Sequence, residues 1–234
     1  MINRNIARII CVMISVIIMI GACGCMKKDK LSVDNCLEYM KNKYDEEFEY
    51  SGPYDDSQPT SRTLKIFVKN KKYPDSEILV IEEKNGEGTV CHDNYVAIKY
   101  EKDVIDLFKN VAAEIYGECR VIYSVDDIFY LSDSFDNSTV FTEYTSKQSS
   151  NISVSVLLPP DHNREFKENE LNQVYQKLCE NSMVCTFNVY YVNNTELYGS
   201  LNSEEEMMLE SEWYDHKGQL VIDDDYSIET EMWR

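Results

Sequence analysis

Two hydrophobic periodicities alternate along this chain of 234 residues, and their order restricts the possible folds more than any other feature. Helical stripes repeat every three to four residues, whereas strand-like segments carry an apolar residue at every second position. The predicted helices span 33–44, 103–116, 139–147 and 169–181, and the predicted strands span 48–51, 64–69, 77–83, 89–100, 120–124, 152–157 and 185–192. This mixed order indicates an α+β fold in which helices pack on antiparallel β-sheets.

Short polar segments mark the ends of these elements. Ser32 is placed to cap the first helix, and Gly117 is placed to end the second. Residues 85–86, Asn-Gly, have the sequence of a hairpin turn. Near the C-terminus, residues 215–218 and 223–225 are predicted turns between two or three strands.

The segment 126–138 is rich in Asp and Ser and is the predicted boundary between two parts of the body. It would separate a first α+β half, 33–125, from a second α+β half, 139–234. Both halves have a similar order of elements, a helix plus a meander, although no sequence repeat relates them.

The first 22 residues differ from the rest of the chain. Arg4 and Arg8 precede an apolar run from Ile9 to Ile20 that is interrupted only by Ser15. A membrane-spanning helix needs about 20 apolar residues, so this run is short for a permanent span. It predicts a cleaved signal peptide over 1–22. The alternatives are an uncleaved anchor helix and a signal peptide cut at another residue.

Residues Ile20-Gly21-Ala22-Cys23 resemble the lipobox of the bacterial lipoprotein family. In that family the cysteine thiol accepts diacylglycerol and becomes the new N-terminus. The resemblance implies that Cys23 carries acyl chains such as palmitate and anchors the protein to the extracytoplasmic face of the cell membrane. A second register would place the lipid on Cys25, but it lacks the aliphatic residue. Residues 23–32 then form the lipidated cysteine and a short tether.

Charge excludes one class of partner. The chain carries 42 acidic and 23 basic residues, a net charge of −19. Nucleic-acid binding requires a basic surface that displaces phosphate counterions, so we predict no nucleic-acid partner. Hydrophobic residues make up 43% of the chain, which is enough for a folded body.

Six cysteines remain once Cys11 in the signal and the lipidated Cys23 are set aside. They are Cys25, Cys36, Cys91, Cys119, Cys179 and Cys185. Disulfides are possible outside the cytoplasm, but six cysteines allow about 15 pairings and no spacing selects one. Cys36 also lies on the apolar stripe of the first helix, as a small core residue would. No Cys-x-x-Cys motif is present.

Catalytic candidates are few. The histidines are His92, His162 and His216, and none belongs to a common hydrolase or zinc motif. Cys91-His92-Asp93 has the residue types of a thiol site, but in a strand Cys91 and His92 would point to opposite faces. We therefore predict no catalytic residue, no cofactor and no metal site.

Two weaker binding candidates lie in the C-terminal half. Asp223, Asp225 and Glu229 offer oxygen ligands for calcium, but the EF-hand pattern is absent and an Asp-rich turn explains them more simply. Aromatic pairs could present a platform to a sugar or a protein, although packing within strands also favours them. These aromatic residues are Tyr190, Tyr191, Trp213, Tyr214 and Trp233.

Three short phrases, 37–44, 47–50 and 93–95, resemble a helix-plus-meander of uncharacterised lipoproteins from low-GC Gram-positive bacteria. The resemblance covers about residues 33–116 and implies a location but no activity. The sequence favours a non-enzymatic, membrane-anchored module that binds a protein or an envelope component. The alternatives are an envelope enzyme that uses His92 and the acids, and a small-ligand receptor, which 212 mature residues would make unusually small.

Overall fold

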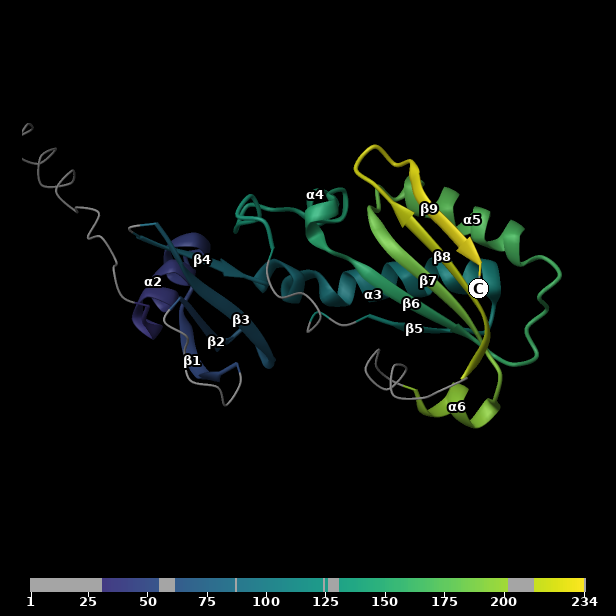
Figure 1. Cartoon of the computed structure of the whole chain (residues 1–234), viewed down its shortest axis with the longest axis horizontal. Helices are drawn as coiled ribbons and strands as arrows, with labels where there is room; N and C mark the ends of the chain where they lie inside the picture. The colour runs from purple at the N-terminus through teal and green to yellow at the C-terminus, as the bar shows by residue number, and fades with distance from the viewer. Residues whose placement is uncertain are drawn as a thin grey trace, which may run out of the picture.

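The computed structural model describes residues 31–54, 62–86, 88–123, 125, 131–201 and 213–233. It contains two β-sheets, and the main hydrophobic core extends from one sheet to the other (Figure 1). The predicted α+β class is confirmed. The signal peptide, Cys23, Cys25 and the tether up to residue 30 lie outside the described residues. Within them, no helix is long and apolar enough to cross a bilayer.

The first sheet is an antiparallel meander of four strands in chain order. They are β1 (Phe48–Pro53), β2 (Thr63–Asn70), β3 (Tyr73–Asn85) and β4 (Gly88–Asp93). Alternation in β2 buries Leu64, Ile66 and Val68 on one face. Asn85 pairs with Gly88 across the predicted hairpin, where Gly86 has a φ of 62° that suits glycine.

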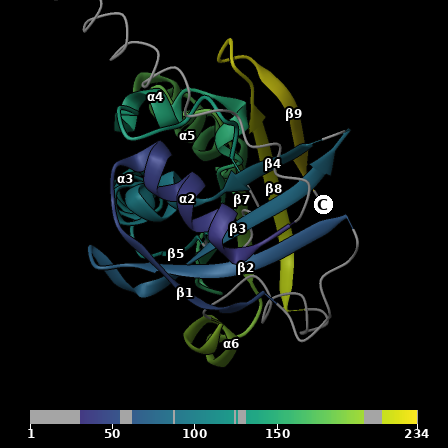
Figure 2. The ribbon, with the colours of Figure 1, turned by 90° about the vertical axis from the view of Figure 1, so that its left-hand side faces the viewer.

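Helix α2 (Val33–Tyr44) has the bounds that its apolar stripe predicted. The Ser32 side chain accepts a hydrogen bond from the backbone N–H of Asn35 at 3.2 Å, which caps the first turn as expected. Cys36, Met40 and Tyr44 are buried against the sheet. Figure 2 shows α2 lying across the four-stranded sheet.

Helix α3 (Tyr95–Tyr116) begins earlier than the sequence indicated. Residues 94–100 were assigned to a strand, and this was wrong because the run 95–98 is apolar at every position and has no distinguishing period. The run is buried on a helix instead. Gly117, with a φ of 73°, ends the helix as predicted, and its N–H donates to the carbonyl of Ala113.

The second sheet has five strands in chain order and departs from a simple meander. They are β5 (Arg120–Ile122), β6 (Ser153–Leu158), β7 (Cys185–Val192), β8 (Tyr214–Ile222) and β9 (Ile228–Trp233). Strands β6 and β7 are parallel, and α5 (Lys167–Glu180) forms the crossover between them. Three short helical segments complete the described part: α4 (Phe141–Thr145), η1 (Gln148–Ser150) and α6 (Thr195–Ser200).

Two local predictions in this region need correction. Strand β5 was assigned to the first half, but it pairs with β6 and therefore belongs to the second sheet. Residues 215–218 were expected to form a turn, yet they lie inside β8, where Gly218 pairs with Val189 of β7. Sheet pairing outweighs the turn propensity of Asp and Gly there. The turn at 223–225, between β8 and β9, is confirmed.

Helix α3 joins the two sheets in one core. Its N-terminal part lies against the first sheet, while Phe108 stacks on Phe187 of β7 with ring centroids 6.2 Å apart. In Figure 1, α3 runs from the first sheet to the face of the second sheet on which α5 also lies. The helix is therefore shared between both sheets.

The carboxylate of Asp93 holds the start of α3 and the end of α2 together. It is fully buried and accepts hydrogen bonds from the hydroxyls of Tyr39 (2.8 Å) and Tyr44 (2.7 Å), and from the backbone N–H of Tyr95 (2.9 Å). Lys43 Nζ lies 2.9 Å from the same carboxylate and supplies the opposite charge. Burial, followed by the charge of Asp93, raises the pKa of both tyrosines, so they remain donors.

Asp93→Asn is expected to lower the free energy of unfolding by about 3–5 kcal/mol, because it leaves the mostly buried Lys43 side chain without its counter-charge. Asp133→Asn is the matched control, since Asp133 is 68% exposed and forms an ion pair with His92 at the surface. Its loss should change stability by less than about 1 kcal/mol. Urea unfolding followed by circular dichroism measures both, and equal effects would contradict the role of Asp93.

Candidate functional site

Cys91, His92 and Asp93, which have the residue types of a thiol site, do not assemble into one. Cys91 and His92 are consecutive residues of β4, so their side chains point to opposite faces. His92 Nδ1 lies 3.3 Å from Asp133, and the Asp93 carboxylate is occupied by the network described above. The three neighbours in sequence therefore have three separate environments.

The other two histidines contact the same residue of the second sheet. His162 lies in the segment that joins β6 to α5, and its ring is 5.8 Å from the ring of Tyr191 on β7. His216 on β8 approaches the same tyrosine from the neighbouring strand, with ring centroids 6.4 Å apart. Tyr191 is thus the common neighbour of two histidines that lie 54 residues apart in sequence.

Glu170 provides the charge at the centre of this group. It lies in the first turn of α5, and its carboxylate oxygens are 3.2 and 3.3 Å from His162 Nε2. The Tyr191 hydroxyl donates a longer hydrogen bond to Glu170 at 3.4 Å. Both partners of the His162–Glu170 pair are mostly buried, with side chains 12% and 14% exposed. Screening by water is therefore reduced at this pair.

Tyr116, the last residue of α3, completes what we call the His162 cluster: His162, Glu170, Tyr191 and Tyr116. The Tyr116 and His162 rings meet edge to face, 5.8 Å apart. The Tyr116 residue is only 6% exposed, and its hydroxyl has no hydrogen-bond partner among the described residues. Burial and then the nearby Tyr191 and Glu170 raise the pKa of Tyr116, so the hydroxyl keeps its proton.

The open side of the His162 cluster carries a charged pair. Arg164 lies over the Tyr191 ring at 5.9 Å and donates to Asp215 at 2.7 Å. These side chains are 33% and 43% exposed, so they lie between the buried cluster and solvent.

The His162 cluster lies where α/β units usually bind ligands. Strands β6 and β7 run parallel, and the segment with His162, the first turn of α5 and the Tyr191 end of β7 all lie at their carboxyl edge. This edge is at the right of Figure 1, beside the C-terminal end of α3. Crevices outside the carboxyl ends of parallel strands are the common ligand site in such sheets.

Chemically, the His162 cluster combines a hydrogen-bonded imidazole with a free buried donor. A histidine that donates Nε2–H to a carboxylate keeps its lone pair on Nδ1 and can accept a proton. The Tyr116 hydroxyl can donate to an oxygen of a ligand. The cluster can therefore hold a polar group between an acceptor and a donor.

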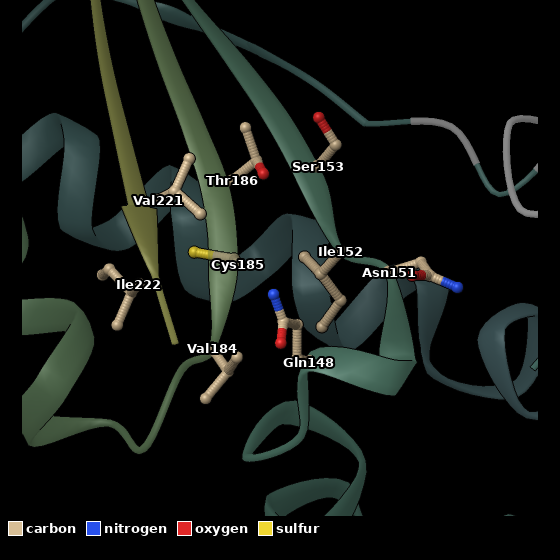
Figure 3. A pocket seen from close by; sticks show the side chains of 9 residues that line it. All are labelled: Gln148, Asn151, Ile152, Ser153, Val184, Cys185, Thr186, Val221 and Ile222. Atoms are coloured by element: carbon tan, nitrogen blue, oxygen red, sulfur yellow. The ribbon is translucent and has the colours of Figure 1, made fainter. Parts of the chain in front are cut away.

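A cavity of about 220 Å³ opens at the other end of the same strands. Figure 3 shows its lining from β6, β7, β8 and the segment around Gln148. Cys185 is the ionisable residue in this lining, and burial raises the pKa of its thiol, so the nucleophilic thiolate is disfavoured. Because the lining contains no histidine or carboxylate, this cavity offers no acid–base chemistry.

The aromatic residues considered as a possible binding platform pack against one another, as strand packing would also predict. Trp213 is 4% exposed, and its ring lies 4.7 Å from Tyr190 and 4.8 Å from Tyr214. Tyr191 points to the other face of β7, into the main core. The aromatic pairs therefore serve packing in the described part of the chain. The Trp233 side chain lies outside the described residues.

The candidate calcium ligands form a turn. Asp223 accepts hydrogen bonds from the backbone N–H and the hydroxyl of Ser227, and Asp225 accepts from the same N–H. The Glu229 side chain lies outside the described residues. Where the structure is described, no three His, Cys, Asp or Glu side chains gather as metal ligands.

The sequence pointed to two of the four cluster elements. His162 was singled out as a histidine, and Tyr191 was singled out as an aromatic residue. Glu170 and Tyr116 were not, because only the parallel pairing of β6 and β7 brings α5 and α3 together at this edge. The available signal was Pro159-Pro160, which stops β6 just before a histidine and a helix start.

Comparison with known proteins leaves the family open. No protein-family model and no curated protein matches the chain. A solved structure described as a DUF5037 family protein from Ruminococcus gnavus is similar over 84% of this chain and 94% of its own, with 13% identity and a TM-score of 0.39. This likeness is too weak to carry an inference about function.

Tyr116→Phe is expected to raise the free energy of unfolding by about 1 kcal/mol, because it removes a buried hydroxyl that lacks a partner. Tyr44→Phe removes a hydroxyl that donates to buried Asp93, so it should lower stability by about 1.5–3 kcal/mol. Thermal and urea unfolding of both variants measure the contrast. Destabilisation by Tyr116→Phe would show that its hydroxyl is satisfied in the free protein.

Proposed function

We propose that the chain is a lipid-anchored, extracytoplasmic binding protein that holds a polar group of a protein or envelope ligand at the His162 cluster. The anchor is inferred from the lipobox-like residues at Cys23. The binding role is inferred from one observation, the buried Tyr116 hydroxyl, which has no hydrogen-bond partner among the residues that the structure describes. A buried donor of this kind is costly to leave unpaired, and a ligand that accepts its hydrogen bond removes that cost.

Three further features support a binding site at this edge. The carboxyl ends of parallel strands are a common place for ligands. The imidazole of His162 and the guanidinium of Arg164 both lie against the ring of Tyr191 and carry polar atoms that a ligand can contact. In addition, Glu170 orients the His162 ring, so the site is arranged before a ligand arrives.

A second candidate function is acid–base catalysis at the same cluster. The hydrogen bond between His162 and Glu170 favours it, because a carboxylate that orients an imidazole is a frequent arrangement of general bases. No cysteine or serine nucleophile is among the contacts of His162 in the described residues, so water or a substrate hydroxyl would have to attack. This alternative predicts turnover that His162→Gln abolishes.

Chemical cross-linking of intact cells that produce the tagged full-length chain tests the proposed function. The wild-type chain is expected to capture a reproducible partner, and Tyr116→Phe should reduce capture by roughly fivefold to tenfold, the value of one hydrogen bond. Because Tyr116→Phe should not destabilise the fold, loss of capture would report on the site. Mass spectrometry identifies and quantifies the captured molecules.

Two controls separate the parts of this proposal. Tyr175→Phe removes a hydroxyl of α5 that donates to the Tyr226 carbonyl, away from the cluster, and should leave capture unchanged. Cys23→Ala should release the chain from the membrane and abolish capture of a membrane-bound partner. Equal capture by wild type and Tyr116→Phe would reject the site, whereas membrane retention of Cys23→Ala would reject the anchor.

A further inference from the structure

Two of the six cysteines of the body face each other between α2 and the first sheet. Cys36 is fully buried on the inner side of α2, and Cys91 is half-buried on β4. The neighbouring Cys91 thiol, followed by burial, raises the pKa of Cys36. They lie 55 positions apart in sequence, so only the fold brings them together.

Contacts on both sides of the pair fix this arrangement. On one side, the buried Glu82 carboxylate accepts hydrogen bonds from the Ser32 N–H at 2.7 Å and from Asn35 Nδ2 at 2.8 Å. Glu82 is the register partner of Cys91. Cys91 therefore lies next to Glu82, the residue that accepts hydrogen bonds from the start of α2.

On the other side, the Asp93 carboxylate accepts a hydrogen bond from the Tyr39 hydroxyl at 2.8 Å. Asp93 is two residues after Cys91, so both side chains point from the same face of β4. Cys36 lies between Asn35 and Tyr39 on the helix, and Cys91 lies between Glu82 and Asp93 on the sheet. The hydrogen bonds thus hold one thiol opposite the other.

We propose that Cys36 and Cys91 are a modification site at which the two thiols are oxidised to a disulfide that ties α2 to β4. The cellular part of this proposal rests on the extracytoplasmic location proposed above, because disulfides persist in oxidising compartments. The pairing itself rests on the geometry alone. It selects one of the pairings that the cysteine spacing left open.

The oxidant is an external disulfide, either of a small thiol such as glutathione or of a protein oxidase. The half-buried Cys91 loses its proton and attacks one sulfur of that disulfide, which forms a mixed disulfide and releases one thiol. Cys36 then loses its proton and attacks the Cys91 sulfur, which forms the Cys36–Cys91 bond and releases the second thiol. Two protein thiols are oxidised, and one external disulfide is reduced to two thiols.

The remaining described cysteines provide internal controls. Cys179 Sγ lies 3.7 Å from the carbonyl oxygen of Tyr226, and Cys185 is buried in the wall of the cavity in Figure 3. Cys119 is half-buried after the end of α3. All three belong to the second sheet and the helices packed on it, far in the fold from α2.

A redox titration of the full-length chain in detergent tests the pairing. The protein is equilibrated with mixtures of oxidised and reduced glutathione, alkylated in denaturant, digested and analysed by mass spectrometry. The expected product is a peptide pair joined through Cys36 and Cys91 and lighter by two hydrogen atoms than the two thiol peptides. Cys119, Cys179 and Cys185 should be alkylated. Full alkylation of Cys36 and Cys91 at every potential would overturn the proposal.

Variants and a cellular measurement complete the test. Cys91→Ser should leave Cys36 alkylated in the oxidising mixtures, whereas Cys119→Ser should leave the linked peptides unchanged. Linked peptides in Cys91→Ser that join Cys36 to another cysteine would overturn the pairing. In cells, an impermeant surface label reports the location independently. Surface-labelled chain with both thiols free would overturn oxidation in the cell, while chain that the label cannot reach would instead count against the proposed location.

Discussion

The shared helix α3 is the constraint on which the rest of the structure depends. Each sheet leaves one apolar face to cover, and a single helix of 22 residues, about 33 Å long, covers part of both. Its N-terminal end is fixed by the Asp93 carboxylate, and its C-terminal end carries Tyr116 into the His162 cluster. The position of the candidate site therefore depends on contacts made at the opposite end of the same helix.

Buried polar groups differ between the two sheets in whether they have hydrogen-bond partners. In the first sheet, Glu82 and Asp93 are buried, and each accepts hydrogen bonds that hold α2 in place. At the second sheet, Glu170 is paired with His162, but the neighbouring Tyr116 hydroxyl has no partner in the described part of the chain. Buried polar groups are normally paired, so this contrast separates a structural network from a candidate binding site.

Much of the fold could be predicted from periodicity, because elements such as α2 and β2 expose one face and bury the other. The bounds of α2 and β7 agree with the expected 33–44 and 185–192. Two predictions from the sequence were wrong. At 95–100, burial on all sides leaves no hydrophobic periodicity that separates a helix from a strand, and at 215–218, strand pairing overrides turn propensity. The parallel pairing of β6 and β7 was also missed, because pairing direction depends on contacts between distant segments.

The site was less predictable for the same reason. Histidines can be counted in a sequence, but a partner such as Glu170 and an unpaired hydroxyl such as that of Tyr116 exist only in the folded chain. The same holds for the cysteines. Their spacing in the sequence left all pairings open, whereas the fold places Cys91 of β4 beside Cys36. Residue types were visible in the sequence, whereas proximity was not.

Native-state hydrogen exchange along α3 tests the central claim most directly. If one helix serves a single core, backbone amides in its first half, such as Tyr100, and in its second half, such as Ala112, should exchange with the same opening free energy, equal to that of global unfolding. Increasing urea should lower both values together. Exchange of the first half through a separate, smaller opening would contradict the account, because it would show that the first sheet and its part of α3 unfold independently.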